Sequence, residues 1–314
     1  MLSYARTRLL LTVPVLMGVS VLTFMILHLI PGDPAQLLLG DMGGGSASGD
    51  VSDAAYENLR RELGLNDPLP VQYANYVADA VRLDFGRSFQ TNRPVSHSIR
   101  EVLPYTLQLT VVGLGLAIVI GGVLGVVAAL HRNSWIDNAT MALSLVGLAM
   151  PSFWLGFILI QIFALRFGWL PSTGTGGFSS VVLPAATLGL VASGVIARLV
   201  RSTMLEVLRQ EYVVTARAKG LRNRVVILRH ALRNALIPVV TIVGLQFGAL
   251  LSGAVIIETV FARRGLGRLA VEAILRRDYP MVQGTILVAA VGYVVVNLAV
   301  DLSYAWLDPR IKYG

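Results

Sequence analysis

The sequence predicts an all-α polytopic membrane protein with six transmembrane helices and a water-exposed loop subdomain after the first helix. Its 314 residues are 55% hydrophobic and 14% charged, with a mean hydropathy of +0.68, which is too little charge to cover a soluble globule. Six apolar stretches span or nearly span a hydrocarbon core of about 30 Å at about 1.5 Å per residue. They are Leu9 to Ile30, Pro104 to Leu130, Ala139 to Leu165, Val181 to Ala197, Leu236 to Ile257 and Gly284 to Leu307.

The first stretch is expected to be an uncleaved membrane anchor. Arg6 and Arg8 precede it, as they would precede a signal peptide. Signal peptides, however, have apolar runs of about 7 to 15 residues that end in a small-residue cleavage site. Here the run is longer and PGDPAQ follows it.

Proline and glycine inside these stretches predict kinks and close helix packing. Pro14, Pro151 and Pro184 lie within apolar stretches, where neighbouring helices can satisfy the carbonyls that proline leaves free. Glycines at helical spacing let backbones approach closely, although ordinary glycine enrichment in membrane helices is an equal alternative. The second stretch contains Gly113, Gly115, Gly121, Gly122 and Gly125.

The predicted domains are an N-terminal transmembrane helix (1–30), an extracytoplasmic subdomain (31–103) and a five-helix core (104–314). Ten of the eighteen acidic residues lie between Pro31 and Leu103. Short helices such as Asp53 to Leu63 are expected there. The glycine-rich stretch Gly43 to Gly49 has almost no side chains to pack and is typical of a linker or loop tip.

The distribution of Lys and Arg favours an orientation with both chain ends in the cytoplasm. The inner segments would then carry 14 of these residues and the outer segments 12. Loops longer than about 60 residues are translocated largely regardless of charge. Leaving the first outer loop out of the count therefore increases the excess of Lys and Arg in the inner segments over the outer segments. Five arginines in the last outer loop run against the rule: Arg263, Arg264, Arg268, Arg276 and Arg277.

The sequence contains no pattern typical of catalysis or metal binding. It has no cysteine, which excludes disulfides, thiolate metal sites and thiol catalysis, and the HExxH, GxSxG and Walker A motifs are absent. Each of the four histidines lacks a second ligand at metal spacing. The net charge of +8 could indicate nucleic acid, but the aromatic residues lie mostly in the apolar runs rather than among the basic residues. We therefore expect no enzyme activity, cofactor or metal on this chain, and no nucleic-acid partner.

One stretch fits the loose dinucleotide-binding pattern GxGxxA. It runs from Gly265 to Ala270 and follows the β-branched run Val255 to Val260. That run belongs to a membrane stretch without a surrounding βαβ unit, and Glu272 and Asp278 come too early for the ribose-binding position about 20 residues on. A loop turn is the preferred interpretation.

Polar side chains within the apolar stretches are candidates for a translocation route, because polar groups are costly in hydrocarbon. Gln161, Gln246 and Asn297 could line such a route or form hydrogen bonds between helices. Asp301 lies six residues before Leu307, about 9 Å from the helix end, where an interfacial salt bridge with Arg310 is favoured.

The most informative segment runs from Glu211 to Pro238 and is polar and rich in arginine. Nine basic residues fall between Arg198 and Arg233, which is too many for the bilayer core. A basic loop of this kind is expected in water on the cytoplasmic side.

Two helices separated by a glycine are expected around this segment. Thr203 to Lys219 is predicted as one helix with Gly220 as its left-handed C-terminal cap, and another helix begins near Asn223. The second helix would have an apolar face and a basic face, consisting of Val225, Leu228, Leu232 and Ala235 and of Arg222, Arg229 and Arg233. Such a hairpin could fit a cleft in a cytoplasmic protein or rest on anionic lipid headgroups.

At these residues the sequence resembles the permease subunits of binding-protein-dependent ABC importers. Those subunits carry a cytoplasmic loop of the form EAA, three residues, Gly, then about nine residues to Ile-x-x-Pro or a close variant. Here Thr215 to Gly220 reads TARAKG, with Ile237-Pro238 downstream. Threonine in place of glutamate resembles the dipeptide and oligopeptide branch, whose loops read YVxTARAKGL. The resemblance covers nearly the whole chain and includes PGDP from Pro31, LDFG from Leu83 with Ser88, ETVF from Glu258, GLG from Gly265, RDYP from Arg277 and LDPR from Leu307.

The long outer loop is similar to that of the first (B-type) permease of the pair in this branch, and the glycine-rich insertion near Gly43 is the main departure. The resemblance implies that a coupling loop, residues 203–236, docks into a nucleotide-binding subunit. The residues that it assigns to this docking are Glu211, Tyr212, Thr215, Ala216, Arg217, Ala218, Lys219, Gly220 and Leu221.

The resemblance also implies a location and a set of partners. The chain would lie in the bacterial cytoplasmic membrane beside membrane lipid and a second, homologous permease chain. Two ABC ATPase subunits or domains would bind ATP and Mg²⁺, and an extracytoplasmic substrate-binding protein would deliver the solute to the outer loop.

The expected function is therefore ATP-driven import of dipeptides or short oligopeptides. Members of the family also carry nickel complexes, haem, glutathione and other small solutes, and these remain alternatives. An ATP-independent channel or secondary transporter is an alternative of another class. It would be expected to show an ionisable relay at mid-membrane or inverted repeats with broken helices, and neither is evident.

Overall fold

The structure is a computed structural model that describes residues 2–29, 35, 53–62 and 64–307, and these residues are almost entirely helical. Within these ranges there is no β-strand, only an isolated antiparallel bridge between Arg87 and Pro94. The all-α class is therefore confirmed. The predicted features at Pro31 to Pro34, Gly43 to Gly49 and Asp308 to Arg310 lie outside the described residues, as does the side chain of Asp301.

The chain divides into two compact units, which we describe separately. Unit 1 contains Val102–Arg268 with Met1–Leu9 and Tyr293–Gly314. Unit 2 contains Leu10–Glu101 and Leu269–Gly292. The boundaries fall within the helices α1 (Leu2–Leu29), α5 (Val95–Leu130), α12 (Leu266–Leu275) and α13 (Tyr279–Leu307).

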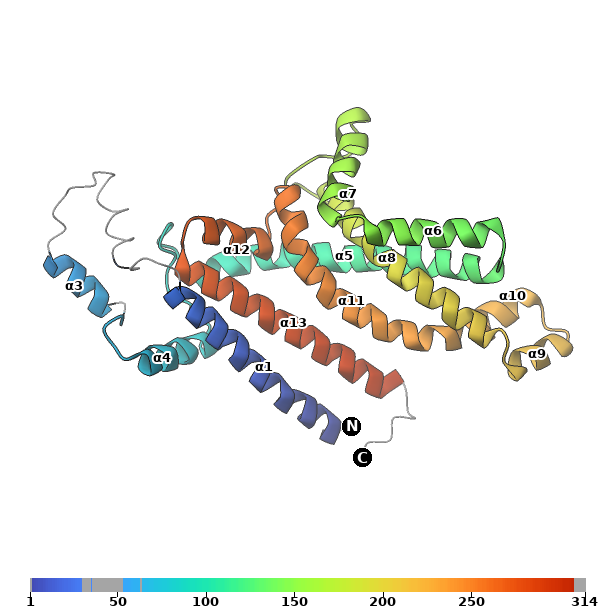
Figure 1. Ribbon diagram of the computed structural model, residues 1–314, viewed down its shortest axis with the longest axis horizontal. Coiled ribbons are helices and arrows are strands. Elements are labelled where there is room, and N and C mark those ends of the chain that lie inside the picture. The colour runs from blue at the N-terminus through green and yellow to red at the C-terminus, as the bar shows by residue number, and fades with distance from the viewer. Residues whose placement is uncertain (1, 30–34, 36–52, 63, 308–314) are drawn as a thin grey trace. The chain divides into compact units, whose positions relative to one another are not determined.

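Helix α8 (Ser179–Val207) is the central element of unit 1 and extends ten residues beyond the predicted end at Ala197. It packs against α6 (Trp135–Ala149), α7 (Ser152–Leu159) and α11 (Leu232–Val260) (Figure 1). Residues along its length, such as Leu188, Ile196 and Met204, are buried in one apolar core with Ala254 and Ile257 of α11. Pro184 lies inside the helix, as predicted.

Glycines of α5 allow the backbone of that helix to approach α8 closely. A Cβ atom on Gly121 would lie 2.7 Å from the carbonyl oxygen of Ser193, and one on Gly125 would lie 2.6 Å from that of Ala197. Gly113 also faces α8, whereas Gly115 and Gly122 face open space. Close packing, rather than simple glycine enrichment, therefore explains three of the five glycines.

The predicted span Ala139 to Leu165 is not one straight helix. Helix α6 ends at Ala149, α7 begins at Ser152, and the two directions differ by 106°; Figure 1 shows α7 turning away from α6. Pro151 occupies the position just before α7, where its ring cannot continue the preceding helix. After Leu159 the α7 segment continues as the π-helix η1 (Ile160–Arg166).

Four helices in the described part of the chain are long and apolar enough to cross a membrane, and the bent pair would make a fifth. The four are Val95–Leu130, Ser179–Val207, Asn223–Val260 and Tyr279–Ala299. In α1, which contains Pro14, the described apolar part is the shorter Leu10–Met25. The polytopic helical class is thus supported, whereas the predicted count of six is not confirmed.

Unit 2 joins residues 10–101 to the end of α12 and the start of α13. It includes the predicted short helix, α3 (Asp53–Glu62), and α4 (Leu69–Val81), in which the Tyr73 hydroxyl lies 2.8 Å from that of Ser20 in α1. Ser88 Oγ donates to Asp278 Oδ2 at 2.5 Å, and the Phe89 N–H donates to Asp278 Oδ1 at 3.1 Å. Ser88 and Phe89, just after the LDFG motif, therefore meet the RDYP motif through this buried carboxylate.

Candidate functional site

The coupling loop forms two helices after the end of α8. Helix α9 (Glu211–Ala218) follows α8 after three residues, so the prediction of one helix from Thr203 to Lys219 was wrong. The break occurs at Gln210, whose backbone is extended with φ −71° and ψ 145°. The loop thus bends away from the axis of α8 before the TARAKG sequence is reached, and α9 and α10 (Asn223–Val225) lie at the tip of the unit in Figure 1.

Gly220 ends α9 as predicted. Its φ is +74°, in the left-handed region that glycine adopts without steric cost. Its N–H donates to the Arg217 carbonyl at 2.9 Å, and the Leu221 N–H donates to the Ala216 carbonyl at 3.3 Å. These two bonds form a Schellman motif, which satisfies helix-end carbonyls that would otherwise lack partners.

The second helix begins at Asn223 as predicted, and its predicted apolar face is divided between buried and exposed residues. The π-helix η2 (Val226–Ala231) connects α10 to α11, and five-residue spacing there places Val226 and Ala231 on the buried side. Four-residue spacing then continues the buried face to Ala235. Val225 and Leu228, predicted on the same apolar face as Ala235, are 37% and 50% exposed.

A small apolar core fixes α9 against its neighbours. Val213, Ala216 and Val226 are buried together, with Val207 and Leu208 packed against them. The core thereby joins α9 to both the end of α8 and the start of the next helix. Asn234 Nδ2 also donates to the Tyr212 hydroxyl at 2.7 Å, and Thr215 Oγ1 donates to the Glu211 carbonyl at 2.9 Å.

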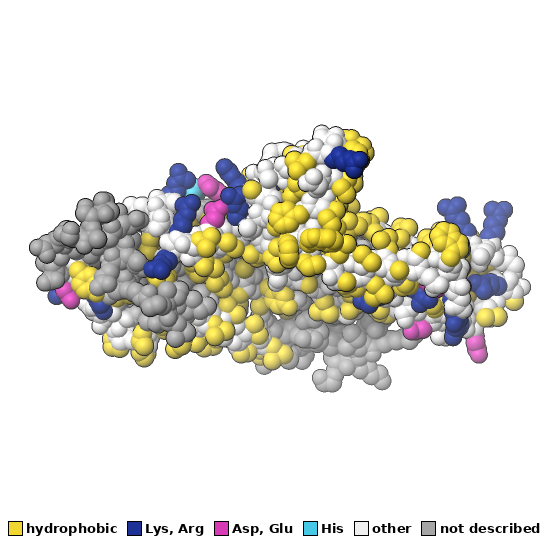
Figure 2. Space-filling view, turned by 45° about the horizontal axis from the view of Figure 1, so that its top comes forward, with side chains coloured by type: hydrophobic (Ala, Val, Ile, Leu, Met, Phe, Trp, Pro, Cys, Tyr) yellow, Lys and Arg dark blue, Asp and Glu magenta, His cyan; other side chains and the backbone are white. Residues whose placement is uncertain are grey.

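The outer surface of the loop combines apolar and basic side chains. Val214 is 57% exposed and Leu221 42%, and Glu211, Arg217, Ala218 and Lys219 are exposed as well. Figure 2 shows Lys and Arg side chains gathered around α9 and α10 in unit 1. Exposed apolar groups framed by positive charge are typical of a surface that docks a partner.

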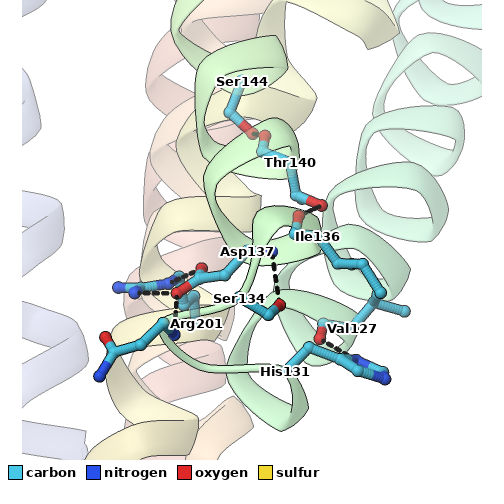
Figure 3. A network of polar contacts seen from close by, with 9 residues as sticks. Val127, His131, Ser134, Ile136, Asp137, Thr140, Ser144 and Arg201 are labelled. Carbon is cyan, nitrogen blue, oxygen red and sulfur yellow. Dashed lines mark hydrogen bonds and ion pairs between the residues drawn. The ribbon is translucent and has the colours of Figure 1, made fainter.

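An ion pair that the sequence did not reveal lies near the base of the coupling loop. Arg201 of α8 donates from Nε to Asp137 Oδ1 at 2.6 Å and from Nη2 to Oδ2 at 2.7 Å (Figure 3). The Asp137 side chain is 2% exposed, and its Oδ2 also accepts from the Asn133 N–H at 3.1 Å. Neither residue belongs to a motif, so the pairing depended on the fold.

The predicted route residues are not brought together by hydrogen bonds. Gln246 Nε2 lies 3.5 Å from the Ala192 carbonyl, which is an interhelical contact at the limit of hydrogen bonding. Gln161 of η1 is exposed and Asn297 of α13 is half-buried. Among described residues no group of acids and histidines could hold a metal ion. A translocation route through the three residues stays a prediction.

A second polar network lies at the C-terminal end of α11 and explains the GxGxxA pattern from Gly265. Glu258 is fully buried and accepts from Thr106 Oγ1 at 2.5 Å and from the N–H groups of Gly267 and Arg268 at 2.9 and 3.1 Å. These N–H groups belong to the first turn of α12, where a carboxylate is stabilising. The stretch from Gly265 is a turn into a helix capped by a carboxylate, with no dinucleotide site needed to explain it.

One of the five arginines predicted in the last outer loop is buried within this region. Arg263 is 1% exposed, and its Nη2 donates to Gln108 Oε1 at 2.9 Å and its Nη1 to Ser180 Oγ at 3.2 Å. Burial lowers the pKa of Arg263, while the nearby Glu258 opposes that shift. Arg263 therefore has a role inside the protein and is a poor indicator of membrane orientation.

Comparison with known proteins gives matches along the chain. Residues 121–313 match the family model described as binding-protein-dependent transport system inner membrane component, and residues 1–110 match the model of the N-terminal region. The dipeptide transport system permease protein DppB of Alkalihalophilus pseudofirmus is 45% identical over the full length of both chains. Glutathione transport system permease proteins GsiC of Escherichia coli K12 and Pectobacterium atrosepticum are 42% and 43% identical, again over full length.

The fold is also similar to a solved transporter structure. A chain of the MetNI methionine ABC transporter, described in inward-facing conformations, has a TM-score of 0.58 and 21% identity. The similarity covers 67% of this chain and 96% of that chain. At this level of identity the comparison supports the fold alone.

Proposed function

Because this chain belongs to the family of inner membrane components of binding-protein-dependent transport systems, we propose that it is the permease through which an ATP-driven importer moves dipeptides or short oligopeptides. Permeases of this kind work in the inner membrane with an ATPase and other subunits. The observation that carries the proposal is the capped hairpin of the coupling loop, attached to a helical membrane unit without a catalytic motif.

The substrate class is supported by the chemistry that the relatives' names share. DppB is named for dipeptides and GsiC for glutathione, which is itself a tripeptide. Both solutes have at least one amide bond, a charged amino group and a carboxylate. A short peptide is therefore the substrate that we propose first, with nickel complexes and haem as alternatives within the same importer type.

The coupling loop is suited to receive mechanical work from a partner. Its exposed Val214 and Leu221 can enter a cleft, while buried Val213 and Ala216 hold α9 to the end of α8. A displacement of α9 must therefore move α8 or disrupt the small core. Two conformations of the membrane helices can then be biased by ATP on one side and by a loaded binding protein on the other.

The full assembly that we propose has a second homologous permease, two ABC ATPase subunits that bind ATP and Mg²⁺, and an extracytoplasmic substrate-binding protein. Both ends of this chain would be cytoplasmic, so that the coupling loop faces the ATPase subunits. Gln161, Gln246 and Asn297 are the route residues to test first.

Isolation in mild detergent followed by reconstitution tests the proposal. An ABC ATPase and a second permease are expected to co-purify, and proteoliposomes should take up a labelled dipeptide only with ATP and the binding protein present. Parallel assays with glutathione and a nickel complex would identify the solute. Accumulation of solute by this chain alone, without an ATPase, would contradict the proposal.

A further inference from the structure

The Asp137–Arg201 ion pair joins two helices that also pack closely along their lengths. A Cβ atom on Gly194 of α8 would lie 2.5 Å from the Ser144 carbonyl of α6, and one on Gly147 of α6 would lie 3.4 Å from the Leu190 carbonyl. Residue numbers in the two helices run in opposite directions through these contacts, so the helices are antiparallel. The ion pair lies seven residues from the Ser144–Gly194 contact in each helix, or about 10 Å along the axis.

The two kinds of contact constrain the helices differently. Apolar and backbone packing resists separation but is non-directional, so it permits small sliding movements. A bidentate guanidinium–carboxylate pair fixes both distance and orientation. Separating the pair would leave a buried charge unpaired, which is strongly unfavourable. Where the ion pair lies, α6 must therefore move together with α8.

Each of the two helices is followed by a bend in the chain within unit 1. Arg201 lies six residues before the end of α8 at Val207, and Val207 packs against the small core that holds α9. Asp137 lies in the first turn of α6, which ends at the 106° corner before α7. In Figure 3 the Asp137 carboxylate faces the Arg201 guanidinium across the gap between the two helices.

We propose that Asp137 and Arg201 are a positioning pair that makes α6 move with α8, so that displacement of the coupling loop reaches the corner between α6 and α7. The proposal rests on the function proposed above, because it requires a partner that displaces the coupling loop. The pair transmits movement and does not contact the solute or the nucleotide.

The test measures solute uptake and ATP hydrolysis in the complete reconstituted transporter, with its binding protein, for three variants. Asp137→Asn removes the charge with little change of shape. Asp137→Leu combined with Arg201→Met replaces the pair by apolar side chains, which often preserves stability. Arg198→Gln is the matched control, because Arg198 is exposed one turn earlier on α8.

Asp137→Asn is expected to lower uptake per ATP hydrolysed on the order of ten-fold, within the usual range of coupling between sites. The double variant should assemble and hydrolyse ATP at the wild-type rate but remain poorly coupled. Arg198→Gln should behave like wild type. Wild-type coupling in the double variant, or a parallel loss of uptake and hydrolysis in Asp137→Asn, would show a merely structural role and overturn the inference. Absence of ATP-dependent uptake by the wild type would instead contradict the proposed function.

Discussion

The carboxyl group of Glu258 occupies the space where a side chain on Gly265 would stand. A Cβ atom built on Gly265 overlaps the carboxyl carbon and both oxygens of Glu258. The absence of a side chain at Gly265 therefore leaves room for the carboxylate. That carboxylate accepts hydrogen bonds from the Thr106 hydroxyl and from the N–H groups of Gly267 and Arg268 in the first turn of α12. Two motifs that are seven residues apart in the sequence form one structural unit.

Replacement of Gly265 by alanine should destabilise the protein. The methyl group would displace Glu258 and leave buried N–H groups unsatisfied, at a cost of about 2 kcal/mol or more. Thermal unfolding in detergent measures the effect. Gly115→Ala is the matched control, because Gly115 faces open space, and an equal loss in both variants would contradict the prediction.

Replacement of Gly220 by valine should impair transport while leaving membrane insertion intact. A β-branched residue at φ +74° is strained by about 1 to 2 kcal/mol, so the end of α9 should rearrange. Co-purification of the ATPase and dipeptide uptake should both fall. Gly220→Asn, which tolerates the left-handed conformation, should retain most activity; equal activity in the valine and asparagine variants would argue against a role for the cap.

Reversal of charge at Arg217 should weaken the attachment of the ATPase. Arg217 is exposed on α9, so Arg217→Glu is expected to leave the fold unchanged while it alters the charge presented to a partner. Retention of the ATPase during purification at increasing salt concentration measures the change. Arg264→Glu, at an exposed position in the loop before α12, is the control, and identical retention in both variants would defeat the prediction.

Val213 and Val214 offer a direct comparison of buried and exposed positions in α9. Val213 is fully buried and Val214 is 57% exposed. Val213→Ala should cost about 1 to 2 kcal/mol of local stability and increase the rate of tryptic cleavage at Arg217 or Lys219 several-fold. Val214→Ala should leave that rate unchanged. Equal cleavage rates in the two variants would mean that the small core does not hold α9.

The contact between Ser88 and Asp278 should control local opening in unit 2. Asp278→Ala leaves the Ser88 hydroxyl and the Phe89 N–H without their acceptor, a loss of about 2 kcal/mol. Hydrogen exchange of residues 83–95 should therefore become faster. Asp79→Ala, at an exposed position of α4, should have no such effect; unchanged exchange in Asp278→Ala would contradict this role of the carboxylate.

Features that depend on neighbouring residues were predictable from the sequence. The helical membrane class follows from apolar stretches, because hydrocarbon requires backbone hydrogen bonds within each segment. The cap at Gly220 follows from the freedom of glycine at positive φ, and the start of a helix near Asn223 was also correct. The TARAKG motif indicated the family without any knowledge of the fold.

Tertiary structure decided the features that depend on distant parts of the chain. The break at Gln210 and the π-helical register of Val226 and Ala231 depend on how the helices pack. A kink at Pro151 was predictable, but its angle of 106° was not. The sequence placed Asp137 beside an apolar stretch and Arg201 in a basic run, but their 2.6 Å contact required α6 to lie antiparallel to α8. Local propensity specifies helices and caps, whereas pairing between segments 64 residues apart requires the burial that packing alone provides.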